Sequence, residues 1–477
     1  MYLQQILNGV SCRVIGNGNP EVTSLSCDTS TVKNGCLFFC LKGKRYDGHE
    51  FFRKALGDGA VAIVCEHPLP TKALQIVVDD VRSVMCIAAK NFYGNCVDKL
   101  RVISIVGTNG KTSTSYILEA ILTKAGHNVA VVGTNGIFFN GQRHASALTT
   151  PDPIELHYWF MQMYLNKVDT VIMEVSAHAI ALHKVDGIVS EIAIFTNFSQ
   201  DHLDFFGTME NYAAAKLSFF DQKYVKNVIS NVDDELGREI ANLLPSATYS
   251  VGNDGDVVAR DLQIGDTLSS YQVSVFGQRS LVVTHLAGKF NVYNTLAAIT
   301  CASVLGVDID TITTAVGEVR CVAGRNETLI RSDGAKIVVD FAHTPDGVQN
   351  ILSFLKGTCQ GKLIVVFGCG GNRDKFKRPL MGEVVSKFAD FAVLTNDNPR
   401  YEDPKLIAQD VAERLTCNYK IILNRSQATE YALSIATSCD TVAILGKGAE
   451  EYQEIRGRKS PYSDVEVVRN LLRRDSV

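Results

Sequence analysis

A lysine and two hydroxyl side chains close a glycine-rich turn near residue 110 and could bind a nucleotide. The turn follows the apolar run 102–106, precedes an expected helix, and reads Gly107-Thr108-Asn109-Gly110-Lys111-Thr112-Ser113. Backbone N–H groups of such a turn surround phosphate, and the helix directs its positive end at the same anion. Lys111 can reach the β- and γ-phosphates, and the Thr112 hydroxyl can bind Mg²⁺. The turn therefore predicts binding of ATP or GTP.

The spacer inside this turn is short. Only Thr108 and Asn109 separate Gly107 from Gly110, whereas the common phosphate loop has four residues at this place. This short form narrows the range of families to which the chain can belong.

Polar side chains further along could complete a site with the turn. Glu174 ends the apolar run 171–173, and on a neighbouring strand its carboxylate would suit Mg²⁺, although a charge at a strand end can also face water. His202, in the polar loop 196–204, could contact metal or phosphate or lie on the surface. Lys216 reads as an ordinary solvated helix lysine. Asn294 either offers a donor and an acceptor to a base or simply starts a helix.

The last third of the chain carries charges of a different kind. Asp340 ends a strand and could contact ribose or a bridging water. Further expected sheet ends carry Arg378, Asn398, Arg400 and Glu450. A guanidinium binds a carboxylate in a two-point fork and a glutamate binds an ammonium, so together they would suit an amino acid. Alternatively these are scattered surface charges, since Asn-Pro is also a common turn former.

The bulk composition excludes several classes of protein. The 477 residues carry a net charge of -4, which gives no footprint for nucleic acid or a membrane surface. The N-terminal segment does not read as a secretory signal, and no apolar run approaches the roughly 20 residues of a spanning helix. We therefore expect a cytoplasmic protein without membrane insertion. The 13 cysteines are expected to be buried thiols, and a zinc site at Cys36 and Cys40 is not expected.

The order of the expected strands and helices predicts an α/β protein of three domains, and the length of 477 residues agrees with that number. Residues 1–98 form a small α/β domain with strands at 36–41, 60–65 and 74–78 and a helix at 81–95. Residues 99–323 form a central, mostly parallel P-loop domain, and residues 324–477 a Rossmann-like doubly wound domain. The expected central strands are 102–106, 128–132, 170–174, 192–196 and 227–230, with a local antiparallel addition at 261–285. Those of the last domain are 336–340, 362–367, 391–395, 419–423 and 441–445.

Over nearly the whole length, the chain resembles the Mur ligases of bacterial cell-wall synthesis. The motifs that carry the resemblance are Gly107 to Thr112, Glu174 to Ser176, Asn197 to Asp204, Ala215-Lys216, Asn291 with Asn294, Gly324-Arg325 with Glu327, and Asp340 to Asp346. Thr149-Thr150-Pro151 and Asp397-Asn398-Pro399-Arg400 are most similar to members that add a third residue to UDP-N-acetylmuramoyl-L-alanyl-D-glutamate. In that family the Asp-Asn-Pro-Arg form accompanies meso-diaminopimelate, and lysine-adding members differ there.

The resemblance implies an ATP-dependent amide ligase of cytoplasmic peptidoglycan precursor synthesis, and hence of cell-wall biogenesis, cell shape and cell division. ATP is the co-substrate, and one or two Mg²⁺ ions are the implied cofactors. The first domain would hold the UDP end of the substrate, the central domain ATP, and the last domain the incoming amino acid.

The resemblance also implies roles for individual residues. The ATP positions are Gly107, Thr108, Asn109, Gly110, Lys111, Thr112, Ser113, Asn294, Arg325 and Asp340. The Mg²⁺ positions are Thr112, Glu174, His202 and Lys216, where Lys216 matches a lysine that is carbamylated in the family and so becomes an anion. The UDP-dipeptide positions are Thr29, Ser30, Thr149, Thr150, Ser176 and Lys184. The diaminopimelate positions are Arg378, Asp397, Asn398, Pro399, Arg400, Gly446 and Glu450.

Four departures from the family pattern affect these assignments. Ala449 stands where the family usually has histidine, Lys184 stands for an arginine, and Leu182 for a glutamine. The uridine segment reads Asp28-Thr29-Ser30 in place of Asp-Ser-Arg. Lysine keeps the charge of arginine but loses its two-point fork. We therefore expect the same substrate with altered contacts.

Three alternatives compete with this interpretation. One is the same ligation with L-lysine. A second is a ligase like folylpolyglutamate synthetase, which shares the short loop and a similar lysine but lacks the N-terminal UDP domain and the Asp-Asn-Pro-Arg motif. The third is a P-loop ATPase, a switch or partitioning protein, that hydrolyses nucleotide without ligation.

Overall fold

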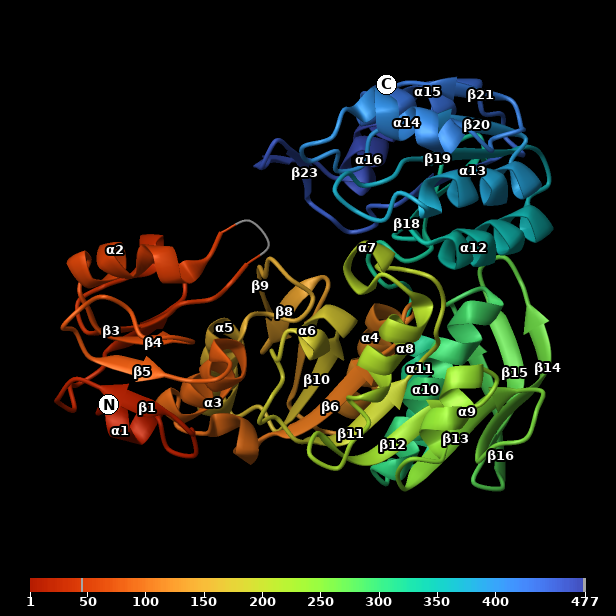
Figure 1. The fold of residues 1–477 in the computed structure, drawn as a ribbon. Helices are drawn as coiled ribbons and strands as arrows, with labels where there is room; N and C mark the ends of the chain where they lie inside the picture. Colours follow the sequence, from red (N-terminus) through yellow and green to blue (C-terminus); the bar gives the residue numbers. More distant parts are fainter. Residues whose placement is uncertain (44–45, 475–477) are drawn as a thin grey trace.

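The structure, a computed structural model, describes residues 1–43 and 46–474 and contains three main sheets (Figure 1). They fall within residues 13–77, 101–284 and 327–445. The α/β class and its mostly parallel central and C-terminal sheets are confirmed. The proposed domain limits at 98 and 323 lie between these sheets and remain predictions.

The N-terminal sheet has the strand order β1-β5-β4-β3-β2. Its core strands β3 and β4 are buried along almost their whole length, as expected for apolar runs covered on both faces. The Asp28 side chain accepts from Ser30 N and caps the short 3₁₀ turn that carries the two uridine-segment residues. The elements are β1 (Arg13–Ile15), β2 (Ser24–Ser26), β3 (Cys36–Phe39), β4 (Ala60–Cys65), β5 (Gln75–Val77), α1 (Leu3–Ile6), α2 (Phe52–Gly57) and α3 (Val81–Phe92), with 3₁₀ turns η1 (Thr29–Thr31), η2 (Gly48–Phe51) and η3 (Cys96–Lys99).

The central sheet places β6 (Arg101–Val106), which leads into the glycine-rich turn, between two parallel neighbours. They are β10 (Thr170–Val175) and β11 (Ser190–Phe195). Glu174 is level with Ile105, and Phe195 with Val106. The residues that end all three strands therefore meet at one edge, where open α/β sheets bind ligands.

The rest of this sheet extends in both directions from these strands. The order is β16-β15-β14-β13-β12-β11-β6-β10-β7-β8-β9, and the expected antiparallel addition is present as β14 to β16. The other strands are β7 (Val129–Gly133), β8 (Gly136–Phe139), β9 (Gln142–His144), β12 (Val225–Asn231), β13 (Ser246–Val251), β14 (Val257–Ile264), β15 (Ser269–Val275) and β16 (Gln278–Thr284). The helices are α4 (Lys111–Lys124), α5 (Pro153–Leu165), α6 (Ala177–Ala181), α7 (Leu203–Phe206), α8 (Met209–Leu217), α9 (Glu235–Ala241), α10 (Lys289–Val304) and α11 (Ile309–Glu318).

The C-terminal sheet has the order β17-β18-β22-β19-β20-β21 and is parallel except for its first strand. Its strands are β17 (Glu327–Ile330), β18 (Lys336–Asp340), β19 (Leu363–Phe367), β20 (Phe391–Leu394), β21 (Tyr419–Ile421) and β22 (Thr441–Leu445), followed by the hairpin β23 (Tyr452–Ile455) and β24 (Arg458–Pro461). Its helices are α12 (Pro345–Thr358), α13 (Lys377–Phe388), α14 (Pro404–Ala412), α15 (Arg425–Ile435) and α16 (Asp464–Arg474). The sequence analysis did not predict the hairpin of β23 and β24.

The C-terminal domain lies above the central domain in Figure 1, with α7 and β18 near their junction. Among the described residues, no helix combines the length and apolar character needed to cross a bilayer.

Candidate functional site

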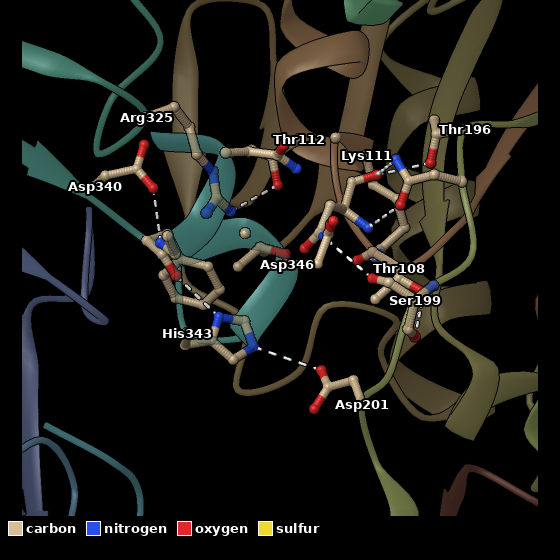
Figure 2. Close-up of a pocket in the computed structure, with 18 of the residues that line it drawn as sticks. Thr108, Lys111, Thr112, Thr196, Ser199, Asp201, Arg325, Asp340, His343 and Asp346 are labelled. Carbon is tan, nitrogen blue, oxygen red and sulfur yellow. Dashed lines mark hydrogen bonds and ion pairs between the residues drawn. The ribbon is translucent and has the colours of Figure 1, made fainter. Parts of the chain in front are cut away.

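A cavity of about 660 Å³ lies where the central and C-terminal sheets face each other. One wall comes from the glycine-rich turn and the ends of β10 and β11, and the other from loops that follow β18, β19, β20 and β22. Strand ends far apart in sequence therefore converge on one space. Figure 2 shows part of this lining, with Arg325 directed at Thr112 and His343 at Asp201.

The glycine-rich turn fits tightly against the strands beside it. Gly107 has φ 156° and Gly110 has φ 85°, and a Cβ at these positions would clash with Thr196 Oγ1 and Asn294 Oδ1, respectively. Thr196 Oγ1 donates to Asn109 O at 2.7 Å. These positions therefore require glycine for both conformation and space.

Lys111 is folded back onto its own turn. Its Nζ donates to the carbonyl oxygens of Gly107 at 2.8 Å and Thr108 at 2.9 Å. Burial lowers the pKa of this amine, Glu174 and Asp201 oppose that change, and Arg325 adds to it. An anion that enters the turn would replace these carbonyl contacts with a stronger charge partner.

Oxygen atoms cluster beside the turn around the Glu174 carboxylate. Thr112 Oγ1 donates to Glu174 Oε2 at 3.0 Å, and Thr134 donates to the same atom from Oγ1 at 2.9 Å. Thr134 N donates to Oε1 at 3.0 Å. Arg325 reaches across from the C-terminal domain and donates to Thr112 Oγ1 at 3.0 Å. Hydroxyl and carboxylate oxygens are the donors that Mg²⁺ prefers.

Asp201 links the two domains from the loop after β11. Lys377 Nζ lies 3.3 Å from Oδ1, and His343 Nε2 lies 3.7 Å from Oδ2. Burial alone would raise the pKa of Asp201, but the charge of Lys377 and a hydrogen bond from His343 hold it well below the usual range. Burial lowers the pKa of the adjacent His202 to about 3, so its imidazole is neutral at pH 7. Neutral imidazole has a nitrogen lone pair to offer to a metal.

Lys216 lies beneath the cavity wall and is 1% exposed. Its Nζ lies 4.7 Å from the ring centre of Tyr212. Burial lowers the pKa of this amine well below its ordinary value, and the charge of Lys111 lowers it further. The structure therefore replaces the solvated helix lysine, expected from the residues alone, with a buried amine whose pKa is lowered.

Three predicted ATP positions outside the glycine-rich turn are held by different contacts. Asp340 accepts from Asn326 N at 2.6 Å and from Ala342 N at 2.7 Å, and burial raises its pKa. Arg325 stacks over the ring of Phe341 at 4.2 Å. Asn294 Nδ2 donates to Asn291 Oδ1 at 3.1 Å, which leaves the amide oxygen directed at Gly110.

Comparisons with known proteins match all three parts of the chain. A UDP-N-acetylmuramoyl-L-alanyl-D-glutamate–2,6-diaminopimelate ligase of Bacillus velezensis is 39% identical over 480 residues, which cover 98% of each chain. The chain belongs to the Mur ligase family. A ligase of the same name from Clostridium botulinum is 37% identical over 99% of this chain and 100% of its own. Three family models match: Mur ligase family, catalytic domain at residues 21–93, Mur ligase middle domain at 105–302, and Mur ligase, glutamate ligase domain at 324–448.

Solved structures agree with this membership. The structure of a UDP-N-acetylmuramoyl-L-alanyl-D-glutamate–2,6-diaminopimelate ligase superposes with a TM-score of 0.67 at 30% identity and 96% coverage of both chains. A Mycobacterium tuberculosis folylpolyglutamate synthase has a TM-score of 0.64 at 18% identity, covering 76% of this chain and 92% of its own, and shares the fold alone. The resemblance to Mur ligases and the assignment as a ligase are confirmed.

Most of the predicted site residues of this Mur ligase line one cavity. They are Thr108, Asn109, Gly110, Lys111, Thr112, Ser113, Thr149, Glu174, Ser176, His202, Asn294, Arg325, Asp340, Asp397, Asn398, Arg400, Gly446 and Glu450. Gly107, Thr150, Lys216 and Pro399 lie behind this lining or beside it; Thr150 Oγ1 donates to Glu174 O at 2.9 Å.

Three UDP-dipeptide positions lie away from the cavity. Thr29 and Ser30 are on η1 of the N-terminal domain. Lys184 is buried, and its Nζ pairs with Asp152 Oδ1 at 2.8 Å. The roles assigned to these residues stay predictions.

The placement of Arg378 in the amino-acid site is wrong. Arg378 is 1% exposed on α13, and its guanidinium binds Glu402 in a fork at 3.0 Å and Asp410 at 2.8 Å. It does not line the cavity; Arg373, five residues earlier in the loop before α13, does. Partial burial and the charge of Arg400 lower the pKa of Arg373, so two guanidinium groups lie near each other. The alternating basic residues of this segment gave no signal to distinguish the two arginines.

We expect Arg378→Met to weaken the fold. The change leaves Glu402, which is 17% exposed, and Asp410 without their shared cation, at a cost of about 2–3 kcal/mol in the free energy of unfolding. Chemical denaturation would measure this cost. Lys375→Met is the matched control, because this lysine is 66% exposed and pairs with the same Glu402. Equal unfolding midpoints for the two variants would contradict the structural role.

Proposed function

We propose that this Mur ligase joins an amine of meso-2,6-diaminopimelate to the γ-carboxylate of D-glutamate in UDP-N-acetylmuramoyl-L-alanyl-D-glutamate, at the expense of ATP. The observation that supports it best is the shared cavity, in which the phosphate-binding turn faces Arg373, Arg400 and Glu450. An enzyme that only hydrolyses nucleotide does not need two arginines and a glutamate on the cavity wall opposite the turn. Full-length relatives that carry this name add to the argument.

The reaction would proceed in two steps. A carboxylate oxygen of D-glutamate attacks the γ-phosphorus of ATP, and ADP leaves, giving an acyl phosphate. The amine of the second substrate then attacks the acyl carbon, and inorganic phosphate leaves. Lys111 would meet the negative charge of the transferring group, together with the backbone N–H groups of the turn. The C-terminal domain forms one wall of the cavity, and its closure on the central domain would keep water from the acyl phosphate.

Mg²⁺ is compatible with the oxygen atoms of this cavity. Thr112 and Glu174 would hold it, and His202 could add its neutral nitrogen. Bound there, the ion would neutralise charge on the ATP phosphates. Among the described residues no cluster of three acidic, histidine or cysteine side chains could hold a metal by itself, which suits an ion that takes most of its ligands from phosphate and water.

Lys216 would support this site as a carbamate. A neutral amine attacks CO₂ at carbon, forms a C–N bond and releases a proton, and the product is an anion. The lowered pKa of Lys216 favours that neutral form. An anion here would face Lys111 and offset the repulsion between the two lysines.

The proposed substrates also indicate where the enzyme works. ATP and UDP-linked sugars are cytoplasmic metabolites, so we infer a cytoplasmic enzyme of peptidoglycan precursor synthesis. The charge of -4 gives no reason to add nucleic acid as a partner.

Phosphate release from ATP tests the proposal against its alternatives. We expect release only when the UDP-dipeptide and meso-diaminopimelate are both present. Release with L-lysine in place of diaminopimelate would indicate the lysine-adding reaction, and release with a folate and glutamate would indicate a folylpolyglutamate synthetase. Release from ATP alone would contradict ligation.

Lys111→Ala should abolish ligation while the fold survives. The variant loses the positive charge that would stabilise the transferring phosphoryl group, so we expect kcat to fall about 100-fold or more. Lys124→Ala, at the solvent-exposed end of the same helix, is the matched control. Circular dichroism should be unchanged in both variants, and substantial ligation by Lys111→Ala would overturn the assignment.

Lys216→Ala should lose activity that short carboxylates such as acetate or formate partly restore. The added anion would occupy the place of the carbamate. A carbamate signal in ¹³C NMR of bicarbonate-treated enzyme should disappear in Lys216→Ala and persist in Lys223→Ala, an exposed lysine beyond the end of α8. Full activity without any carboxylate would exclude the carbamate.

Arg373→Met should raise KM for meso-diaminopimelate and leave KM for ATP unchanged. Removing one charged partner from a carboxylate of diaminopimelate costs about 1–3 kcal/mol, or roughly 5-fold to 150-fold in affinity. Arg378→Met is the control, because this arginine lies outside the cavity. A larger rise in KM for Arg378→Met than for Arg373→Met would contradict this placement.

A further inference from the structure

A fully buried lysine lies directly behind the proposed amino-acid subsite. Lys447 follows β22 in the turn Gly446-Lys447-Gly448-Ala449-Glu450 and is 0% exposed. It does not line the cavity, and neither its charge nor its reach is needed in the two chemical steps. Burying an ammonium is costly, so its partners indicate what it does there.

Lys447 binds two residues that line the cavity. Its Nζ donates to Glu450 Oε2 at 2.7 Å and to Asn398 Oδ1 at 3.1 Å. The Asn398 amide completes a triangle, since Nδ2 donates to the same Glu450 Oε2 at 3.0 Å. One buried cation thus contacts both an amide and a carboxylate of the site.

These bonds fix which way the Asn398 amide points. Oδ1 accepts from Lys447 and also from Glu454 N at 2.9 Å. A reversed amide would place its NH₂ group against a cation and an N–H donor, which is unfavourable. Nδ2 has two hydrogens, and only one of them is used by Glu450. The other remains to donate to a ligand carboxylate.

The same bonds orient the Glu450 carboxylate. Lys447 and Asn398 both bind Oε2, so Oε1 takes part in neither contact. Glu450 is 24% exposed at its side chain, in contrast to Lys447. A ligand ammonium can therefore approach Oε1 while Oε2 stays tied to the protein.

We propose that Lys447 is a positioning residue that sets the amino-acid specificity of the site. It holds the Asn398 amide and the Glu450 carboxylate so that an N–H donor and a carboxylate oxygen face the carboxylate and the ammonium of one amino-acid centre. This inference rests on the proposed function. A buried ion pair adds little to stability compared with an apolar residue of similar size, so stability alone does not explain a lysine here.

Lys447→Met and Lys447→Gln test this role through steady-state kinetics. We expect Lys447→Met to raise KM for meso-diaminopimelate about tenfold or more, because both recognition groups lose their orientation. KM for ATP and for the UDP-dipeptide should stay within about twofold, as should kcat, since these depend on other parts of the cavity. Lys447→Gln keeps one donor group, so its KM should lie between those of Lys447→Met and the wild type.

Lys459→Met is the matched control, because Lys459 is an exposed lysine of β24 that contacts the Tyr452 ring from outside the site. It removes the same charge and should change no KM. Thermal unfolding of each variant shows whether it is folded. If Lys447→Met does not fold, the double variant Lys447→Met/Glu450→Gln replaces it, because this variant leaves no carboxylate without its cation. Its KM for diaminopimelate is compared with that of Glu450→Gln, and the two values should be similar.

Three results would overturn the inference. They are an unchanged KM for diaminopimelate in folded Lys447→Met or Lys447→Gln, a fall in kcat with all KM values unchanged, and, where Lys447→Met does not fold, a double variant whose KM for diaminopimelate differs strongly from that of Glu450→Gln. Failure of the proposed function is seen separately, because wild-type enzyme would then fail to ligate diaminopimelate at all. In that case the same variants are compared with the amino acid that the wild type does use.

Discussion

The site depends on contacts that hold the C-terminal domain over the glycine-rich turn. Asn109 Nδ2 donates to Asp346 Oδ2 at 2.9 Å, Arg325 donates to Thr112, and Lys377 pairs with Asp201. Each joins a strand end of one parallel sheet to a loop or helix start of the other. Because the carboxyl ends of both sheets face the same space, groups for phosphate and for an amino acid can act on one carboxyl group. Neither sheet carries both kinds of group by itself.

Burial then determines the charge of the groups in this space. Burial lowers the pKa of both Lys111 and Lys216, and the charge of Lys111 lowers the pKa of Lys216 further. Asp201 behaves in the opposite way, since its partners Lys377 and His343 keep it ionised despite burial. Burial therefore leaves the pKa of a carboxyl group low where cations face it, and lowers the pKa of an amine that faces another lysine. In the proposed carbamate formation, CO₂ reacts with the neutral form of the amine, which the lowered pKa of Lys216 favours.

Local patterns predicted the elements and the phosphate turn, but long-range packing decided which charged residues face the ligand. The strands that carry Glu174 and Asp340 were predictable because an apolar run ending in a carboxylate is visible in the sequence. Arg373 and Arg378 could not be distinguished, since the answer depends on Glu402 and Asp410, which lie on later segments. Lys447 gave no signal, because its partner Asn398 lies on the distant loop after β20 and is itself held by Glu454 N of the missed hairpin.

The turn that carries Glu450 also touches the phosphate side of the cavity. Gly324 has φ 65°, and a Cβ there would clash with Ala449 N, so the backbones of the two segments lie in direct contact. Gly324 immediately precedes Arg325, which donates to Thr112 in the phosphate turn. A movement of the 446–450 turn on amino-acid binding would therefore press on the segment that carries Arg325. Because this contact is made by backbone atoms, it does not depend on which side chain stands at position 449.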